Sequence, residues 1–446
     1  MKEKIIALLN TGTVDMAQFK VLCSQMNTAD IAEAFVELDK EKDIRLFRLL
    51  PKSMAADVFA CLDASEQELI VKELTDTEIG DIINHLFADD AVDFIEEMPA
   101  NVIQRVLANT KPEKRAIINQ LLQYPDDSAG SIMTTEYVDL YEDITVREAF
   151  DEIRSHGVNK ETIYTCYVIR HDHLLTGIIS AKTLMLAKSH ERIGDIMDTN
   201  LVYAQTSDDQ ESVAALFKKY GLLAMPVVDK EHRLVGIITV DDIVKIIEEE
   251  TTEDFEKMNA LAPSDEPYLK TSIFKLARNR IVWLLFLMIS ATISGSIIAG
   301  FEEAIALLPI LVAFIPMLMD TGGNAGCQSS TLIIRGMAVG EIRMADILRI
   351  LWRELRIALM CGLVLGAVNF VRIYLMNGRN ALLAATVTLS LFVTVIMAKS
   401  IGCLLPIIAK KCRVDPAIMA APLITTIVDG GVLAVYFSIA KLFFKI

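Results

Sequence analysis

The 446-residue chain lacks the residue patterns that mark most enzymes and structural metal sites. Its seven cysteines are scattered and odd in number, and no CxxC spacing occurs, which argues against a disulfide framework or a zinc site. We find no Walker A motif, GxSxG elbow, HExxH helix or catalytic Cys/His pair. The sequence therefore predicts that the protein is not an enzyme.

Basic charge is also scarce, with 43 Lys and Arg against 59 Asp and Glu, giving a net charge of −16. This balance argues against a nucleic-acid partner, which requires a basic surface. The charge is divided unevenly, because residues 1–270 hold 51 acids and 27 bases while residues 271–446 hold 8 and 16. The acidic first part fits cytoplasmic solubility or cation binding, and an ordinary acidic surface accounts for part of the excess.

The N-terminus, which begins MKEKII, has no long apolar stretch followed by a small-residue cleavage site. We therefore expect no signal peptide and a first part that remains in the cytoplasm. Composition changes sharply at about Lys270, after which the remaining 176 residues are largely hydrophobic. The overall prediction is a multi-domain membrane protein.

Residues 1–125 are predicted to form an all-α domain, because apolar residues recur at spacings of three and four. Prolines at positions 51, 99 and 112 interrupt the pattern. The segments ELDKEKDIRLFRLLP and LFADDAVDFIEEMP are similar, and each ends at a proline. This degenerate repeat favours a stacked superhelix over a compact bundle.

Residues 126–250 contain one α/β unit twice, opening at SIMT (131–134) and again at DIMD (195–198). Helices are predicted at 146–156 and 209–220. Predicted strands cover residues 163–169, 174–180, 224–229 and 234–239. The unit resembles a tandem pair of CBS domains, which are usually regulatory and often bind adenine nucleotides. Their ribose-contacting Ser/Thr-x-x-Asp pattern is present as Thr239 to Asp242 in the second copy, whereas Ser180 to Thr183 in the first lacks the acid. The resemblance thus allows one ATP site.

Residues 243–270 are predicted to form an acidic connecting helix and linker, which leads into the membrane part. Five acids lie within two turns, although like charges at this spacing weaken an isolated helix. They are Glu248, Glu249, Glu250, Glu253 and Asp254. A solvated acidic face and a bridge of counter-ions are equally good interpretations.

Residues 271–446 are predicted to form a transmembrane domain of five helices, near 281–300, 305–334, 354–376, 382–408 and 417–441. Proline and glycine interrupt the over-long second span. With the N-terminus inside, eleven Lys and Arg lie on inner flanks and four on outer flanks, which places the C-terminus outside the cytoplasmic membrane. Lys399 falls within the fourth span, where it either extends to the inner face or pairs with an acid.

Asp429 is the most informative residue, because it lies inside the last apolar run. A carboxylate near the middle of a bilayer costs about 2.5–3.5 kcal/mol on insertion scales and is tolerated mainly beside water, a partner or an ion. The alternative is a structural Asp that is hydrogen-bonded to neighbouring helices. Glycines beside Asp429, and in the second-span segment DTGGNAGCQ at 320–328, permit close backbone approach and local unwinding. A broken helix beside a midplane acid is the pattern expected of an ion path.

The ligands available along this path are carboxylate, amide and carbonyl oxygens, since no histidine follows residue 232 and no cysteine cluster adjoins Asp429. Oxygen ligands suit Mg²⁺, Ca²⁺ or Mn²⁺ better than copper or zinc. One acid per chain cannot replace a complete hydration shell, and Mg²⁺ dehydrates reluctantly. Asp429 is thus expected to hold a hydrated ion through water, with a symmetry partner supplying the second charge.

Over essentially its full length the chain resembles the MgtE family of magnesium transporters. The most specific matches are GGNAGCQ at 322–328 and APLITTIVDGG at 421–431, behind a CBS pair. The resemblance implies a homodimeric Mg²⁺ channel with its pore at the dimer interface. It also implies that Asp429 is the pore acid and that Asn324 lines the pore.

The resemblance further implies regulatory Mg²⁺ sites among the cytosolic domains and the connecting helix. The matching positions are Asp57, Asp89, Asp93, Gly130, Glu211, Asp242, Glu250, Glu253, Asp254 and Asp415. Lys245 stands where some relatives have an acid, so the ligand set departs from theirs. A solvated surface acid is the alternative for each position taken alone.

The mechanism predicted from these features is feedback gating, in which cytosolic Mg²⁺ bridges the acidic faces and shuts the pore. Three other interpretations remain open at this stage. The protein could transport another divalent ion such as Mn²⁺ or Co²⁺, or exchange cations. It could also be a membrane-anchored CBS nucleotide sensor, which would leave Asp429 unexplained.

Overall fold

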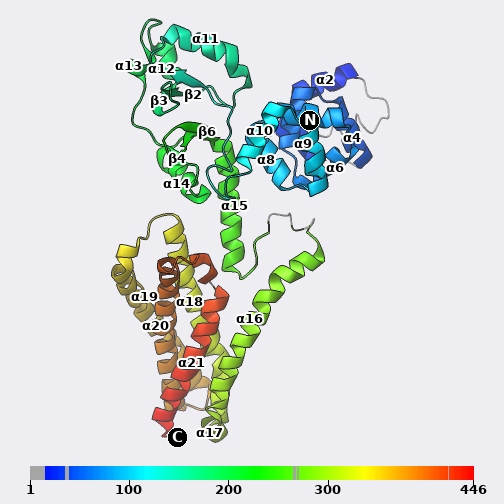
Figure 1. Ribbon diagram of the computed structural model, residues 1–446. Coiled ribbons are helices and arrows are strands. Elements are labelled where there is room, and N and C mark those ends of the chain that lie inside the picture. Colours follow the sequence, from blue (N-terminus) through cyan, green and yellow to red (C-terminus); the bar gives the residue numbers. More distant parts are fainter. Residues whose placement is uncertain (1–15, 36–39, 265–267, 269–270, 420, 446) are drawn as a thin grey trace. The chain divides into compact units, whose positions relative to one another are not determined.

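The computed structural model describes the chain except for residues 1–15, 36–39, 265–267, 269–270, 420 and 446 (Figure 1). It divides into two compact units, Met1–Ile247 and Glu248–Ile446.

The N-terminal part of the first unit is helical throughout its described residues, as predicted. The helices are α2 (Met16–Ser24), α3 (Thr28–Phe35), α4 (Lys40–Leu49), α5 (Lys52–Ala60), α6 (Ala64–Glu73), α7 (Asp76–His85), α8 (Ala88–Glu96), α9 (Ala100–Asn109) and α10 (Pro112–Leu121). Second neighbours pack together, for example α3 on α5, α5 on α7 and α7 on α9. This is the stacking expected of a helical superhelix.

A row of aromatic rings forms the core of these helices. Phe35, Phe47, Phe59 and Phe94 are buried and meet edge to face in sequence, with ring centroids 5.1–6.3 Å apart. The prolines end one helix and begin the next, since Pro51 and Pro99 are the N-caps of α5 and α9 and Pro112 begins α10.

The CBS pair consists of two three-stranded sheets that repeat each other pair by pair. Strands β1 (Asp139–Tyr141), β2 (Thr165–Ile169) and β3 (Leu175–Ser180) form the first, and β4 (Ala204–Gln205), β5 (Ala224–Val228) and β6 (Leu234–Thr239) form the second. In each sheet the first pair is parallel and the second antiparallel. Thr165 pairs with Ser180 and Ala224 with Thr239, so the two ribose-pattern positions are equivalent.

The helices of this pair are α11 (Val146–His156), the 3₁₀ helix η1 (Gly157–Asn159), α12 (Ala181–Leu186), α13 (Ile193–Ile196) and α14 (Gln210–Tyr220). The predictions at 146–156 and 209–220 are confirmed, with Asp209 as the N-cap of α14. The prediction missed β1 and β4, because two or three residues are too few to show alternation. Helix α15 (Val240–Met258) is the predicted acidic helix, and it begins three residues before the predicted position.

The second unit contains five helical segments long and apolar enough to cross a membrane, within Ile273–Ala299, Pro309–Ala338, Met344–Met376, Ala381–Lys411 and Pro416–Phe444 of the described chain. Its helices are α16 (Ile273–Ala299), α17 (Glu302–Leu307), α18 (Ile315–Ala338), α19 (Ile347–Met376), α20 (Ala381–Lys411) and α21 (Ala421–Phe444). Short 3₁₀ helices are η2 (Pro309–Phe314), η3 (Met344–Asp346) and η4 (Pro416–Met419).

The second span is broken at Pro309, one of the predicted positions, but not at the predicted glycines. Helix α18 runs without interruption through Gly322 and Gly323, so the expected unwinding at the glycines is wrong. The chain instead changes from α17 to η2 at Leu308, and Pro316 lies in the first turn of α18, where a missing N–H costs nothing.

The glycines of α18 serve close packing. A Cβ at Gly322 would lie 2.9 Å from Thr394 of α20 and from Val432 of α21, and one at Gly326 would lie 2.8 Å from Ile424. A Cβ on Gly402 of α20 would overlap with the carbonyl oxygen of Gly326. Small residues here allow the three helices to approach closely, as in many membrane bundles.

Candidate functional site

Asp429 lies half-buried in the middle of α21, which is a continuous helix on both sides of it. Its neighbours in the sequence pack against three other spans. Val428 contacts Gly322 and Gly326 of α18, while a Cβ at Gly430 would meet Ile297 of α16 and one at Gly431 would meet Met397 of α20. Within the described part of the chain, the Asp429 carboxylate has no hydrogen-bond or ion-pair partner. A structural Asp tied to neighbouring helices does not fit this environment.

Helix α18 presents a polar stripe on its exposed side. Asp320, Asn324 and Gln328 are spaced four residues apart and are exposed, whereas the glycines between them are buried. The Asn324 amide Nδ2 donates a hydrogen bond to Asp320 Oδ1 at 3.1 Å. This bond orients the Asn324 amide so that its carbonyl oxygen is free to accept. Asp320, whose role the sequence left open, is thus the partner of the predicted pore residue.

A second candidate site lies in the first unit, where α8 faces the start of α15. Asp89 is 7% exposed, and burial together with Asp90 and Asp242 raises its pKa well above the usual value. Burial raises the pKa of Asp90 to about 6, despite the opposing charge of Lys245. Buried acids that repel one another in this way favour the binding of a cation, because its positive charge offsets theirs.

Lys245 partly neutralises this acidic cluster. Its Nζ donates to Asp242 Oδ1 at 3.3 Å, while the other Asp242 oxygen accepts from Thr239. Burial alone would lower the pKa of Lys245, but the carboxylates of Asp242 and Asp90 together raise it. Asp242 is therefore already bonded through both oxygens.

Glu161 is a member of the cluster that sequence reasoning missed. Its Oε2 atom is buried and has no hydrogen-bond partner among the described residues. Burial, followed by the charges of Asp241 and Asp90, raises its pKa to about 8. Glu161 lies in a loop before β2, where no periodicity marks it, so only the fold brings it near α8. Asp90 could have been inferred from its place beside Asp89.

Glu136 attaches α8 to the CBS pair. Its carboxylate accepts from Lys114 Nζ at 2.7 Å, from the Thr134 hydroxyl at 2.8 Å and from the backbone N–H of Ala88, the first residue of α8, at 3.3 Å. Although burial opposes it, the charge of Lys114 and these bonds hold the pKa of Glu136 below its usual value. The acids of α8 are thereby fixed relative to the CBS pair.

Asp93, one turn after Asp89 on α8, also belongs to this cluster although its side chain is exposed. Burial raises the pKa of Asp93 to about 7, and the charges of Asp242 and Asp90 act in the same direction against that of Lys245.

The other predicted residues are less closely grouped, since Asp57 on α5 and Glu211 in the first turn of α14 are exposed. Gly130 is buried, donates its N–H to the carbonyl of Thr206 and leaves no room for a side chain beside Tyr124.

In the second unit, the end of α15 meets the turn before α21. Lys257 Nζ lies 2.9 Å from Asp415 Oδ2 and 2.6 Å from Glu253 Oε1. Burial and the charge of Asp415 raise the pKa of Asp254. Glu250 is half-buried on the same helix. Three of the predicted metal residues, Glu253, Asp254 and Asp415, thus gather here around a lysine.

Among the described residues, no group of three His, Cys, Asp or Glu side chains converges with the geometry of a metal site. The acids approach closely enough to shift one another's pKa but do not form a closed cage. Such an open arrangement fits a hydrated ion, which binds through its water shell, better than a stripped one.

The predicted nucleotide positions occupy equivalent places in the two CBS copies. Thr239 Oγ1 donates to Asp242 Oδ2 at 2.9 Å, while the hydroxyls of Ser180 and Thr183 lie 2.9 Å apart. Only the second copy therefore offers a carboxylate at this position.

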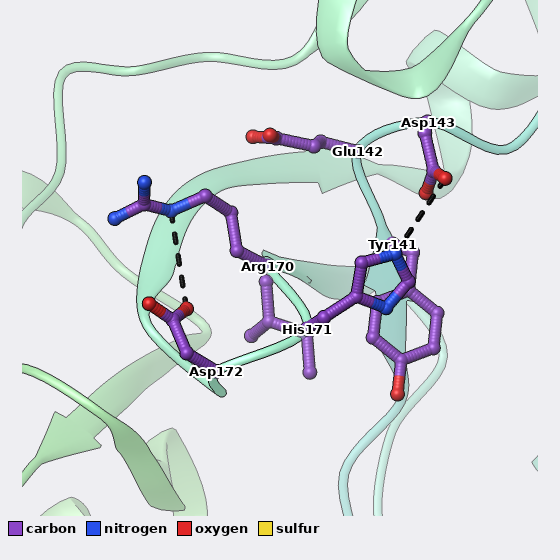
Figure 2. Close-up of a pocket in the computed structure, with 7 residues that line it drawn as sticks. Tyr141, Glu142, Asp143, Arg170, His171 and Asp172 are labelled. Atoms are coloured by element: carbon purple, nitrogen blue, oxygen red, sulfur yellow. Dashed lines mark ion pairs between the residues drawn. The ribbon is translucent and has the colours of Figure 1, made fainter.

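A hollow of about 420 Å³ lies at the opposite end of the first CBS hairpin from Ser180 (Figure 2). Four of the side chains that line it lie in pairs, with Arg170 3.9 Å from Asp172 and His171 3.6 Å from Asp143. The hollow is open and contains none of the predicted site residues.

Comparison with known proteins accounts for all parts of the chain. Residues 315–439 match the MgtE family described as a divalent cation transporter, residues 26–127 the MgtE intracellular N domain, and residues 129–190 and 193–249 the CBS domain. The magnesium transporter MgtE of Thermus thermophilus is 34% identical over 448 residues, covering 99% of both chains. The chain belongs to the MgtE family. MgtE of Bacillus subtilis is also 34% identical, covering 99% of this chain and 96% of its own.

Two solved structures resemble about half of this MgtE family member. The soluble part of a magnesium transporter matches with a TM-score of 0.53 and 29% identity, covering 56% of this chain and 97% of its own. The cytosolic domain of the Mg²⁺ channel MgtE in complex with ATP matches with a TM-score of 0.52 and 34% identity, covering 55% of this chain and 100% of its own. Together with the five apolar segments, these matches identify a multi-pass membrane protein with a CBS pair.

Proposed function

We propose that this protein is a Mg²⁺-selective channel of the cytoplasmic membrane that cytosolic Mg²⁺ closes. The observation that carries the proposal is the carboxylate of Asp429, which has no partner in the described part of the chain and is half-buried in a span that packs against the glycines of α18. A charge in this position is costly unless a cation or water meets it.

The polar stripe of α18 supplies the second part of the path. Asp320, Asn324 and Gln328 cannot face lipid without losing their hydrogen bonds, so this side must face water or another subunit. In addition, α16 has no buried residue in the single chain. Both features support a homodimer whose pore lies between copies, with one Asp429 from each chain.

The chemistry of these groups favours a hydrated ion. Asp429 and the carbonyl oxygens of Asn324 and Gln328 are hard oxygen ligands, which suit Mg²⁺. Two carboxylates from two chains match the charge of one divalent cation. Water molecules that Mg²⁺ retains would bridge the remaining distance.

Gating is proposed to depend on the two acidic regions at α15. At low cytosolic Mg²⁺, burial and mutual repulsion with the acids of α15 disfavour the charged forms of Asp89, Asp90 and Glu161, as their raised pKa values indicate. Mg²⁺ would relieve this repulsion and stabilise the arrangement in which Asp415 and the acids at the end of α15 lie together. Several weak sites that act together would give a steep response.

We also propose that ATP binds at the second CBS copy, where Thr239 and Asp242 provide the ribose pattern. The related cytosolic domain was solved with ATP, and this supports the assignment. Because Asp242 also adjoins Lys245 and the α8 acids, a nucleotide here would be coupled to the regulatory cluster. Equilibrium dialysis with ATP and Asp242→Asn tests the assignment; equal binding by the variant would contradict it.

Uptake in a transport-deficient cell tests the main proposal. Wild-type protein should restore Mg²⁺ accumulation, and excess Co²⁺ or Mn²⁺ should compete weakly. Entry of Co²⁺ or Mn²⁺ in preference to Mg²⁺ would contradict the proposed Mg²⁺ selectivity. Single-channel currents separate a channel from an exchanger, because a one-for-one exchanger of like charges carries no current.

Gating is tested by limited proteolysis of the full-length protein. Added Mg²⁺ should protect the acidic N-terminal helices and α15 over the concentration range that reduces the current. Unchanged cleavage at saturating Mg²⁺ would contradict feedback gating while leaving transport intact.

A further inference from the structure

Three buried polar residues from three different spans meet inside the second unit. Ser329 of α18, Glu354 of α19 and Lys399 of α20 are 1%, 8% and 6% exposed. Lys399 Nζ donates to the Ser329 hydroxyl at 3.2 Å, the Ser329 hydroxyl donates to Glu354 Oε2 at 2.7 Å, and Nζ lies 3.9 Å from Oε2. Lys399 therefore pairs with an acid and does not extend to the membrane surface.

We propose that Ser329, Glu354 and Lys399 form a polar clasp that positions α18, and hence Asn324, for recognition of the transported cation. Neither charged residue touches the path itself, so both are positioning residues. The inference rests on the proposed function for its transport readout and adds a role for residues that the family resemblance did not assign.

The burial of a charge pair inside a membrane protein requires a reason beyond stability. Apolar side chains of similar volume often hold buried positions as well as a buried ion pair does, whereas removal of one partner is strongly unfavourable. What the pair adds is a positional requirement, because the ammonium, the hydroxyl and the carboxylate are all satisfied only while the three helices keep them within hydrogen-bond distance. The clasp thus fixes one packing of α18, α19 and α20.

The rest of the contact between α18 and α20 is made by small residues and does not fix the relative position of the two helices in this way. Gly326 and Gly402 meet backbone to backbone, and Gly322 packs on Thr394. Gly402 lies three residues after Lys399, and Ser329 three after Gly326, so the clasp lies one turn from the glycine contact on the same helix faces. A smooth surface of small residues permits sliding and rotation, and the clasp opposes both.

Rotation of α18 would carry the polar stripe with it. Asn324 lies five residues before Ser329 on one continuous helix, with Asp320 and Gln328 on the same exposed side. Val428, the neighbour of Asp429, packs on Gly322 and Gly326 of α18. The position of α18 therefore also sets where the polar stripe lies relative to Asp429. Loss of the clasp is therefore expected to change cation affinity and selectivity, as well as rate.

The first measurement is Mg²⁺ uptake by Glu354→Gln, Lys399→Met, the neutral pair Glu354→Gln/Lys399→Met and the exchanged pair Glu354→Lys/Lys399→Glu. Single variants should take up Mg²⁺ about ten-fold more slowly or worse, with a higher half-saturating concentration and more Co²⁺ entry. The exchanged pair should recover a large part of the wild-type uptake rate, half-saturating concentration and selectivity against Co²⁺. Ser390→Ala is the matched control, since its buried hydroxyl bonds only to Thr386 of its own helix among the described residues.

A second measurement reads the position of α18 without transport. Gln328→Cys, in a chain whose seven native cysteines are replaced, reports water access to the stripe through its rate of labelling by a thiol reagent. The labelling rate should change several-fold in the single variants and return toward the wild-type rate in the exchanged pair. If wild-type protein carried no Mg²⁺ while labelling followed this pattern, the proposed function would fail and the clasp would stand.

Folding is monitored through membrane abundance and elution as a single species in detergent. If single variants fold and keep wild-type uptake, half-saturation and labelling, the clasp does not position α18. If single variants fail to fold, the neutral pair decides. If the folded neutral pair keeps the wild-type half-saturating concentration, selectivity and labelling rate, the three residues only support the structure and the proposal is overturned. Altered values in the folded neutral pair would sustain the proposal.

Discussion

The ammonium of Lys257 lies 2.9 Å from the carboxylate of Asp415 and so joins the end of α15 to the turn that precedes α21. The same ammonium lies 2.6 Å from Glu253. These two acids, both predicted as metal ligands, are thus already bridged by a cation that belongs to the chain. Lys257 thus holds the end of α15 to the turn before α21 without Mg²⁺, and under the proposed gating it would favour the closed state.

Replacement of Lys257 by Met should therefore raise the cytosolic Mg²⁺ concentration needed for closure. The pair is partly exposed and worth about 0.2–1 kcal/mol, which corresponds to a shift of up to about five-fold. Currents recorded from excised patches at stepped Mg²⁺ concentrations measure this shift. Lys410→Met is the control, because it removes the same charge at an exposed position without a described ion pair. An equal shift in both variants would mean that overall charge, and not the contact with Asp415, is responsible.

The close contact of Gly326 with Gly402 makes a second prediction. Gly402→Ala places a methyl group against backbone, which cannot rotate away, so α18 and α20 must separate. We expect a loss of about 1–3 kcal/mol of stability and a large loss of uptake. Gly295→Ala on α16 is the matched control, since no heavy atom lies within 4 Å of its added methyl group. Thermal denaturation in detergent and uptake would be compared, and equal behaviour of the two variants would contradict the packing account.

Glu161 gives a prediction about pH. Burial raises its pKa to about 8, above the ordinary value of 4.5, so the folded state holds this proton more tightly than the unfolded state does. Its contribution to stability is present at low pH and is lost as pH rises to about 8, at no more than about 1.4 kcal/mol per pH unit. In the absence of divalent cations, hydrogen-exchange protection of α8 should therefore fall between pH 6 and pH 8. Glu161→Gln should flatten this dependence, and an unchanged slope in the variant would assign it to other groups.

The anchoring of α8 by Glu136 is tested with Glu136→Gln. The change weakens the bond from Lys114 and the contact with the N–H of Ala88, which together are worth roughly 1.5–3 kcal/mol. Proteolytic protection of the N-terminal helices should then require a higher Mg²⁺ concentration. Glu113→Gln, at an exposed position in the first turn of α10, serves as the control. Identical protection curves for Glu136→Gln and wild type would exclude this anchor.

Sequence patterns predicted the parts of the fold that have strong periodicity. Helix α11 and the hydrophobic spans follow directly from the spacing and length of their apolar runs. Strands β1 and β4 carry too few residues to show a period, and their places are set by pairing with β2 and β5. The glycines of α18 were taken for a break, but tight contact with α20 and α21 uses them within a regular helix.

The candidate sites were predictable only where the acids lie close in sequence or in a known motif. Asp429 stands out by its apolar surroundings, and its half-buried carboxylate, without a partner among the described residues, is consistent with that prediction. Glu161 and the partner of Lys399 could not be found, since Glu354 lies 45 residues away on another span. Sequence distance hides such contacts, because burial and chain topology alone bring the groups together.

The measurement that tests the account most directly is Mg²⁺ uptake by Asp429→Asn, which keeps the size of the side chain and removes its charge. Glu303→Gln, at an exposed position in α17, removes one negative charge away from the path and serves as the control. With equal amounts of folded protein in the membrane, Asp429→Asn should lose most Mg²⁺ uptake and the control should retain it. Uptake by Asp429→Asn at the wild-type rate and half-saturating concentration would contradict the assignment of Asp429 as the pore acid.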